Sequence, residues 1–209
     1  MMRESLSIVP NSTHRPTTEG DRDLAQAAQG GDETAFASLV RQHSPGLHRA
    51  VARMLGDDTE AWDVVQMALV KAWQKLDRYD PKWSFATWLY RIGTNLAIDV
   101  IRARGSRQRA HDEGTAHHLR LVGDHAPTGD LVHQHDIEHV YRKVLQVLTP
   151  QQRAAFVLRE IEGRDTAEVA ETMGCTPTTV RNHVFQARKA LRREIEVQFP
   201  EYLPAAQRS

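Results

Sequence analysis

Residues 166–185 read Thr-Ala-Glu-Val-Ala-Glu-Thr-Met-Gly-Cys-Thr-Pro-Thr-Thr-Val-Arg-Asn-His-Val-Phe and carry the most specific structural pattern of the 209-residue chain. A small residue, Ala170, lies where two helices must approach closely, and Gly174 accepts the positive φ of a tight turn. Thr176 followed by Pro177 is typical of a helix N-terminus, because threonine caps a helix and proline fits its first position. The stretch therefore predicts a helix-turn-helix unit.

The second helix of this unit combines an apolar stripe with polar side chains. Val180, Val184 and Leu191 recur at helical spacing and predict the buried stripe. Arginine and amide side chains read base edges in the major groove, and further cations neutralise phosphates. The candidate DNA-binding residues are Thr178, Arg181, Asn182, Phe185, Gln186, Arg188 and Lys189. A helical hairpin with a solvated basic face is the plainer interpretation, but the turn glycine and the capped helix favour duplex DNA binding.

Residues 85–104 form a second amphipathic pattern. Its apolar side is made of Leu89, Ile92, Leu96 and Val100. Trp88 lies on this side and is expected to pack in the core. The opposite side carries Arg91, Asn95, Asp99, Arg102 and Arg104. A helix at a nucleic-acid surface and a solvated helix share this pattern, so the stretch alone leaves both interpretations open.

Most of the remaining chain also has helical periodicity. It predicts helices over residues 21–30, 32–56, 57–76, 137–148 and 150–163. Asp32 is an expected N-cap, Gly56 an expected helix end, and Pro45 is expected to bend the helix that contains it. Short links and a core of leucine, valine, phenylalanine and tryptophan favour a compact bundle. We therefore expect an all-α protein with two small helical domains.

The composition changes after Arg104. The following residues are rich in glycine, histidine and aspartate without a sustained apolar period, which predicts a flexible linker. The expected parts are a disordered leader (1–20), a first domain (21–105), the linker (106–134), a second domain (135–200) and a tail (201–209). Seven of the eleven histidines lie between His111 and His139. A polar tether is the plainer interpretation of this segment, and a metal site is the alternative.

Composition excludes several classes of protein. No run approaches the roughly 20 apolar residues of a membrane span, and the polar N-terminus lacks the core of a signal peptide. The single cysteine, Cys175, excludes intrachain disulfides and cysteine-based zinc sites. The formal net charge is zero, yet basic residues cluster in 100–109 and 174–193, and acids cluster in 57–63. We expect a cytoplasmic protein with different partners on different faces.

Three motifs in this order resemble a sigma-70 family sigma factor of the extracytoplasmic-function class (ECF, group 4). Residues 63–73 resemble region 2.2, residues 85–104 regions 2.3 and 2.4, and residues 166–193 region 4.2. The resemblance covers about 21–104 and 135–198. It implies two helical domains, σ2 and σ4, that bind RNA polymerase core through its β′ clamp helices and β flap and guide it to promoter DNA. It implies no enzymatic activity, cofactor, metal or small-molecule substrate, and no membrane association.

The resemblance also assigns roles to the polar residues. Region 2.2 would contact polymerase core through Asp63, Gln66, Met67 and Val70. The region 4.2 residues named above would read the −35 element. Asn95 and Asp99 would hold an unstacked −10 base of the nontemplate strand, and Arg91, Arg102 and Arg104 would hold its phosphates.

Region 2.2 departs from the family pattern, because Trp62 and Met67 occupy positions where an acid is usual. Partial loss of this charge predicts weaker core binding, which a phosphate on Thr59 at the start of the helix would restore. A regulatory Ser/Thr kinase is then an expected partner. The family equally implies an anti-sigma factor, and packing of Trp62 is the plainer interpretation of the substitution.

Two other functions fit parts of the chain. A helix-turn-helix regulator that acts without polymerase core explains residues 166–193 but leaves residues 85–104 unexplained. A metal-dependent enzyme would use the histidine-rich segment, but the chain has no Gly-rich phosphate loop, no His-Glu-x-x-His and no Gly-x-Ser-x-Gly. The promoter sequence and the inducing signal do not follow from the sequence.

Overall fold

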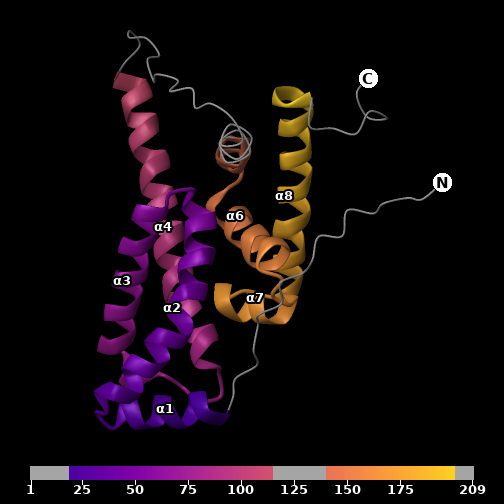
Figure 1. Ribbon diagram of the computed structural model, residues 1–209. Helices are drawn as coiled ribbons and strands as arrows, with labels where there is room; N and C mark the ends of the chain where they lie inside the picture. The colour runs from indigo at the N-terminus through magenta and orange to yellow at the C-terminus, as the bar shows by residue number, and fades with distance from the viewer. Residues whose placement is uncertain (1–18, 115–139, 201–209) are drawn as a thin grey trace, which may run out of the picture.

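The computed structural model describes residues 19–114 and 140–200, with side chains described outside 108–114, and every regular element in these ranges is helical. The elements are α1 (Glu19–Gln29), α2 (Glu33–Leu55), α3 (Asp58–Gln74), the 3-10 turn η1 (Leu76–Arg78), α4 (Phe85–Gly114), α6 (Pro150–Phe156), the π-helical turn η2 (Val157–Ile161), α7 (Thr166–Met173) and α8 (Pro177–Gln198). Residues 140–146 are also helical. The predicted all-α class is confirmed, with α1–α4 beside α6–α8 in Figure 1.

The boundaries of α2 and α3 depend on capping residues. Asp32 accepts hydrogen bonds from the Thr34 hydroxyl (2.6 Å) and the Ala35 N–H (3.1 Å), and these bonds lower the pKa of its carboxyl group. Gly56 ends α2 with a φ of 67°, and Asp57 then accepts a bond from the Glu60 N–H at 2.9 Å. Both the predicted N-cap and the predicted helix end are confirmed. Pro45 lies inside α2 without ending it.

An aromatic cluster forms the centre of the α1–α4 bundle. Phe85, the first residue of α4, is fully buried, and its ring lies 5.8 Å from that of Tyr79 and 6.4 Å from that of Phe36. Trp88 lies one turn further along and contacts Phe85 and Tyr79, with ring centroids 5.7 and 5.4 Å away. The predicted core packing of Trp88 is therefore confirmed. Burying these large rings fixes the start of α4 against α2 and η1.

Helix α4 is longer than the sequence pattern predicts. We expect the linker from residue 106, but the helix continues to Gly114. The residues after Gly105 are mostly good helix formers, such as arginine, glutamine and alanine, so propensity maintains the helix after the apolar period ends. Apolar periodicity marks where a helix packs, and it does not mark where the helix stops.

The second half contains the predicted helix-turn-helix. Gly174 joins α7 to α8 with a φ of 65°, and Thr176 accepts a hydrogen bond from the Thr179 N–H at 3.1 Å. Upstream, Thr149 and Gln152 cap α6 reciprocally, with bonds of 3.0 and 3.3 Å. The single helix predicted over 150–163 is instead α6 followed by the π-helical turn η2.

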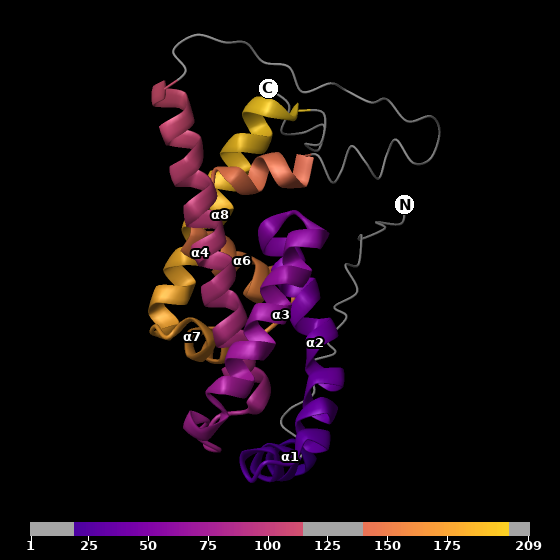
Figure 2. The same ribbon diagram turned by 90° about the vertical axis from the view of Figure 1, so that its left-hand side faces the viewer.

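The two halves are packed together, which the expectation of two linked domains does not anticipate. Helix α7 lies against α4, and η2 lies against α2. Buried apolar residues of both halves belong to one continuous cluster, including Ala97 and Ile98 from α4 and Val169 and Ala170 from α7. A smaller cluster joins residues 144–148 to Ala187 and Leu191 of α8. Figure 2 shows α4 between α3 and α7.

Several expectations concern residues that the structure does not describe. The leader, most of the linker with its histidine-rich segment, and the tail lie wholly or largely outside residues 19–114 and 140–200. Within the described ranges, none of the helices has the length and apolarity needed to cross a membrane. The same ranges contain no group of three or more potential metal-binding side chains.

Two glycines of α4 provide a test of this packing. A Cβ at Gly93 would lie 2.7 Å from Cδ1 of Leu47, which is fully buried, whereas a Cβ at Gly105 meets nothing within 4 Å. We expect Gly93→Ala to lower the free energy of unfolding by about 1–2 kcal/mol because overpacking exceeds the gain in helix propensity. Gly105→Ala should raise it by up to about 1 kcal/mol. Chemical denaturation measures both, and equal effects would contradict the close approach of α2 and α4.

Candidate nucleic-acid and polymerase surfaces

Helix α8 presents its predicted polar face to solvent. Val180, Val184, Ala187 and Leu191 are buried, as the apolar stripe predicts. The exposed residues are Thr178, Arg181, Asn182, Phe185, Gln186, Arg188 and Lys189. Phe185 is 63% exposed. The face therefore combines amides, cations and one apolar group, a combination suited to the edges and phosphates of a duplex.

One of these cations is already paired. Arg188 forms an ion pair with Glu160 of η2, and the carboxylate is the less exposed of the two groups. This pair holds Arg188 beside η2. Exposed ion pairs of this kind contribute little to stability, so a phosphate can replace the carboxylate at small cost.

Helix α4 carries a line of exposed polar residues along one side. Arg91, Asn95, Asp99 and Arg102 are exposed, and their spacing places them on successive turns of one face. Arg102 donates to Asp99 at 3.4 Å, so this carboxylate already faces a cation. Asn95 lies one turn before this pair. The amide, the carboxylate and the two flanking arginines form one continuous polar strip.

Arg104 differs from the other members of the predicted −10 set. Its guanidinium donates to the Leu55 carbonyl at 2.9 Å and forms an ion pair with Glu60. These contacts attach the middle of α4 to the end of α2 and the start of α3. Arg104 is therefore engaged within the first half and does not extend the exposed strip.

Tyr90 lies beside this strip but is buried. Its ring is covered by the Arg164 guanidinium at 3.6 Å from the centroid, and Arg164 is itself buried and paired with Glu168. Burial raises the pKa of the Tyr90 hydroxyl. Tyr90 is therefore not available to stack on a base in this conformation. The sequence around Arg164 does not predict this contact, because nothing in the local pattern indicates a distant aromatic partner.

Helix α3 exposes an apolar face with a few polar members. Trp62, Met67, Val70 and Trp73 are 44%, 46%, 55% and 40% exposed. Asp63 and Gln66 lie exposed on the same side. The Trp62 ring stacks on His48 at 4.0 Å with an interplanar angle of 20°. A contiguous apolar surface with a polar border is typical of a protein-binding site.

Thr59 lies in the first turn of α3. It is exposed, directly after Asp58 and before Glu60, and the preceding residue Asp57 caps the helix. Its hydroxyl is accessible for modification. Added negative charge at this end of a helix interacts favourably with the helix dipole, but it also adds to an acidic turn.

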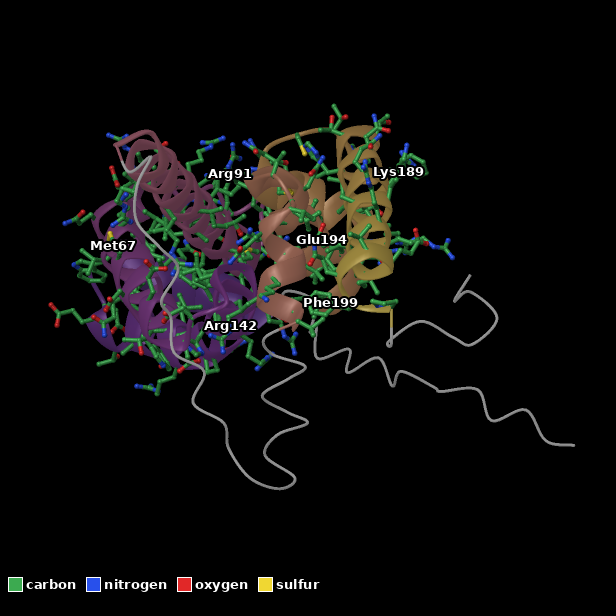
Figure 3. All side chains as sticks on the ribbon, turned by 90° about the horizontal axis from the view of Figure 1, so that it is seen from above. Met67, Arg91, Arg142, Lys189, Glu194 and Phe199 are labelled. Carbon is green, nitrogen blue, oxygen red and sulfur yellow. The ribbon has the colours of Figure 1, made fainter. Side chains whose placement is uncertain are left out.

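The three surfaces face different directions. Figure 3 places Met67 of α3 and Lys189 of α8 on opposite sides of the molecule, with Arg91 of α4 between them. The structure thus brings the strip on α4 near the helix-turn-helix unit and leaves the apolar face of α3 on the far side. The three surfaces therefore do not overlap.

Family models match both halves. The model described as Sigma-70 region 2 matches residues 39–107, and the one described as Sigma-70, region 4 matches residues 139–191. The chain is 33% identical over 186 residues to the RNA polymerase sigma-H factor of Pseudomonas aeruginosa, covering 86% of this chain and 96% of that protein. It is 31% identical over 170 residues to the ECF RNA polymerase sigma factor SigW of Bacillus subtilis, covering 79% and 91%.

Solved structures agree with this similarity. CnrH in complex with the cytosolic domain of CnrY is similar with a TM-score of 0.64 and 27% identity, covering 86% of this chain and 99% of that one. The sigma factor RpoE of Bartonella quintana, in complex with the anti-sigma factor NepR, is similar with a TM-score of 0.56 and 27% identity, covering 78% and 98%. This chain therefore belongs to the sigma-70 family, as an RNA polymerase sigma factor of the ECF class.

Proposed function

We propose that this sigma factor binds RNA polymerase core through α3, reads −35 duplex DNA through α8 and holds an unpaired −10 base on α4. The observation that supports this most strongly is the exposure of all three faces in one chain whose relatives are RNA polymerase sigma factors. Each face has the chemistry of its proposed partner. The protein supplies binding and no covalent chemistry, so it is not an enzyme, and it acts where the polymerase acts, in the cytoplasm.

The −35 element is read by the first turns of α8. Arg181, Asn182 and Gln186 offer the donors and acceptors that distinguish base pairs in the major groove. Lys189 and Arg188 follow on the next turn and reach phosphates. Phe185 provides an apolar contact, for example with a thymine methyl group. The capped start of α8 directs these side chains toward the groove.

The −10 element is held by the strip on α4. An extruded base exposes its Watson–Crick edge, and the Asn95 amide can both donate to it and accept from it. Asp99 lies one turn away and would exchange its contact with Arg102 for a base donor. Arg91 and Arg102 then neutralise phosphates of the unpaired strand. This site binds only a melted strand, so it favours the opened promoter.

Polymerase core is bound by the exposed face of α3. Met67 and Val70 provide apolar area, and Asp63 and Gln66 provide polar contacts toward the β′ clamp helices. The β flap is assigned to the σ4 half through the family resemblance. The alternative, a helix-turn-helix regulator without polymerase, leaves the exposed α3 face and the region 2 match unexplained.

Control of this activity has two candidate routes. Relatives of known structure are bound to the cytosolic domain of CnrY and to the anti-sigma factor NepR, so an anti-sigma factor is one candidate partner. The exposed Thr59 beside the depleted acidic face of α3 supports a Ser/Thr kinase as the other.

The two DNA sites are separable by mutation. Arg181→Ala should weaken binding of −35 duplex by the polymerase complex by about tenfold, because a base contact is worth about 1–3 kcal/mol, and leave binding of single-stranded −10 DNA unchanged. Asn95→Ala should have the reverse effect. Fluorescence anisotropy with the two DNA probes measures both, and Gln198→Ala, at an exposed amide in the last position of α8, is the control. Loss of both activities in either variant would contradict the assignment.

The proposed effect of Thr59 phosphorylation can be measured as a change in the affinity of the protein for polymerase core. We expect the phosphorylated protein to bind polymerase core more tightly than the wild type, and Thr59→Ala to bind like the unmodified protein. Surface plasmon resonance with immobilised core gives the three affinities. Equal affinity in all three forms would eliminate Thr59 as a switch.

A further inference from the structure

A cavity of about 760 Å³ lies where the second half of the protein meets the end of α2 and the middle of α4. Its cationic lining residues come from three helical segments: Arg102 and Arg104 from α4, Arg142 from the helix at 140–146, and Arg153 from α6. Among the described residues that line it, Asp57 alone is acidic. The lining therefore carries four guanidinium groups and one carboxyl group.

Arg153 is the buried cation of this set, with 8% of the residue exposed. Its guanidinium donates to the Met54 carbonyl at 3.3 Å and to the Leu145 carbonyl at 2.6 Å, which are both neutral acceptors. Its Nε has no hydrogen-bond partner in the described part of the chain, where no carboxylate pairs with this residue. Burial lowers the pKa of Arg153. A buried cation without a counter-charge is costly, so an anion bound in the cavity beside it would be stabilised.

Two further guanidinium groups are placed to bind such an anion. Arg102 is paired with Asp99 at 3.4 Å, and both side chains are more than half exposed, so a phosphate can replace the carboxylate at small cost. The stem of Arg142 packs over the end of α2, because a Cβ on Gly56 would lie 2.8 Å from Cγ of Arg142. Arginine binds phosphate oxygens in pairs, so guanidinium groups on separate helices suit a ligand with more than one phosphate.

Most of the other lining residues are apolar. They are Leu55, Ile101, Leu145, Leu148 and Pro150. Gln146 adds an amide that can both donate and accept hydrogen bonds. The volume lies in the range of pockets that hold organic ligands, and it is larger than a phosphate ion needs. A ligand with a flat ring as well as phosphates would use both the apolar and the cationic parts of this lining.

We infer that this cavity binds a small nucleotide, such as a nucleoside diphosphate. The phosphates bind at the guanidinium groups, the base packs on the apolar side chains, and the Gln146 amide bonds to the edge of the base. The lining includes exposed residues such as Arg142 and buried ones such as Leu145, so the ligand enters from solvent. In Figure 3, Arg142 lies on the opposite side of the molecule from Arg91.

This site is separate from the three surfaces described above, apart from one shared residue. Arg102 is the member of the polar strip on α4 that also lines the cavity. The phosphates of an unpaired DNA strand are therefore a second source of the same chemistry. The experiment has to distinguish a free nucleotide from the DNA backbone. It needs neither polymerase nor a promoter, so its outcome does not depend on the proposed function.

Isothermal titration calorimetry with the full chain tests the site directly. The probes are ADP and GDP, with inorganic phosphate and a short oligothymidine as comparisons. We expect one nucleotide to bind per chain. Inorganic phosphate should bind at least about tenfold more weakly, because it leaves the apolar part of the lining in contact with water.

Two substitutions remove the charge and the space separately. Arg142→Glu should weaken nucleotide binding by about tenfold or more, since a hydrogen bond to a charged group is lost. Lys143→Glu makes the same change of charge at the next exposed residue, which does not line the cavity, and should bind like the wild type. Gly105→Leu adds a side chain where a Cβ meets nothing within 4 Å, so it fills part of the cavity and should cause a similar loss.

Circular dichroism checks that each variant remains folded, and leucine favours the helix more than glycine does. Three results would overturn the site: no binding of ADP or GDP, equal affinity for inorganic phosphate, or an equal effect of Lys143→Glu and Arg142→Glu. Unchanged affinity in both Arg142→Glu and Gly105→Leu would also overturn it. Tighter binding of oligothymidine than of either nucleotide, lost in these two variants, would assign the cavity to the DNA backbone and contradict the proposal.

Discussion

The structure depends on the burial of α4 on two of its sides. One side, led by Phe85, packs into the α1–α3 bundle, and a second side receives α7. Only the remaining side, with Arg91, Asn95, Asp99 and Arg102, reaches solvent. Because a helix is rigid over many turns, fixing the two buried sides also fixes the direction of the polar strip. The proposed base-binding site is thus oriented by core packing and not by a loop.

Local features of this fold were predictable from the sequence because they depend on neighbouring residues. The caps at Asp32 and Thr176, the turn at Gly174 and the core position of Trp88 follow from backbone geometry and helical spacing. The buried stripe of α8 follows from the same spacing. These rules act within a few residues, so the sequence contains all the information that they need.

The contact between the halves was not predictable in this way. Arg164 and Tyr90 are far apart in sequence, and no local motif indicates that either is the partner of the other. The capping of α2 by Tyr141 and Arg153 likewise joins residues without a common motif. Burial raises the pKa of the Tyr141 hydroxyl to about 12, so this cap stays a donor through the neutral range. Contacts between residues that are far apart in the sequence can be identified only from the folded structure.

The exposed side chains of α3 and α8 bear on which partners these two helices contact. Trp62 and Met67 replace the acids expected from the family, and both are exposed, which favours an apolar contribution to polymerase binding over a role in the core. Among the described residues, Phe185 is the most exposed of the large aromatic side chains. Several exposed apolar side chains grouped on one face, as on α3, are typical of an interaction surface, whereas a single exposed side chain is common on folded proteins.

The most direct test of the central claim is run-off transcription with purified RNA polymerase core on genomic DNA fragments. The account predicts discrete transcripts that require both core and this chain, each starting downstream of a shared pair of −35 and −10 sequences. Transcripts that are identical with and without the chain, together with no binding of the chain to core, would contradict it.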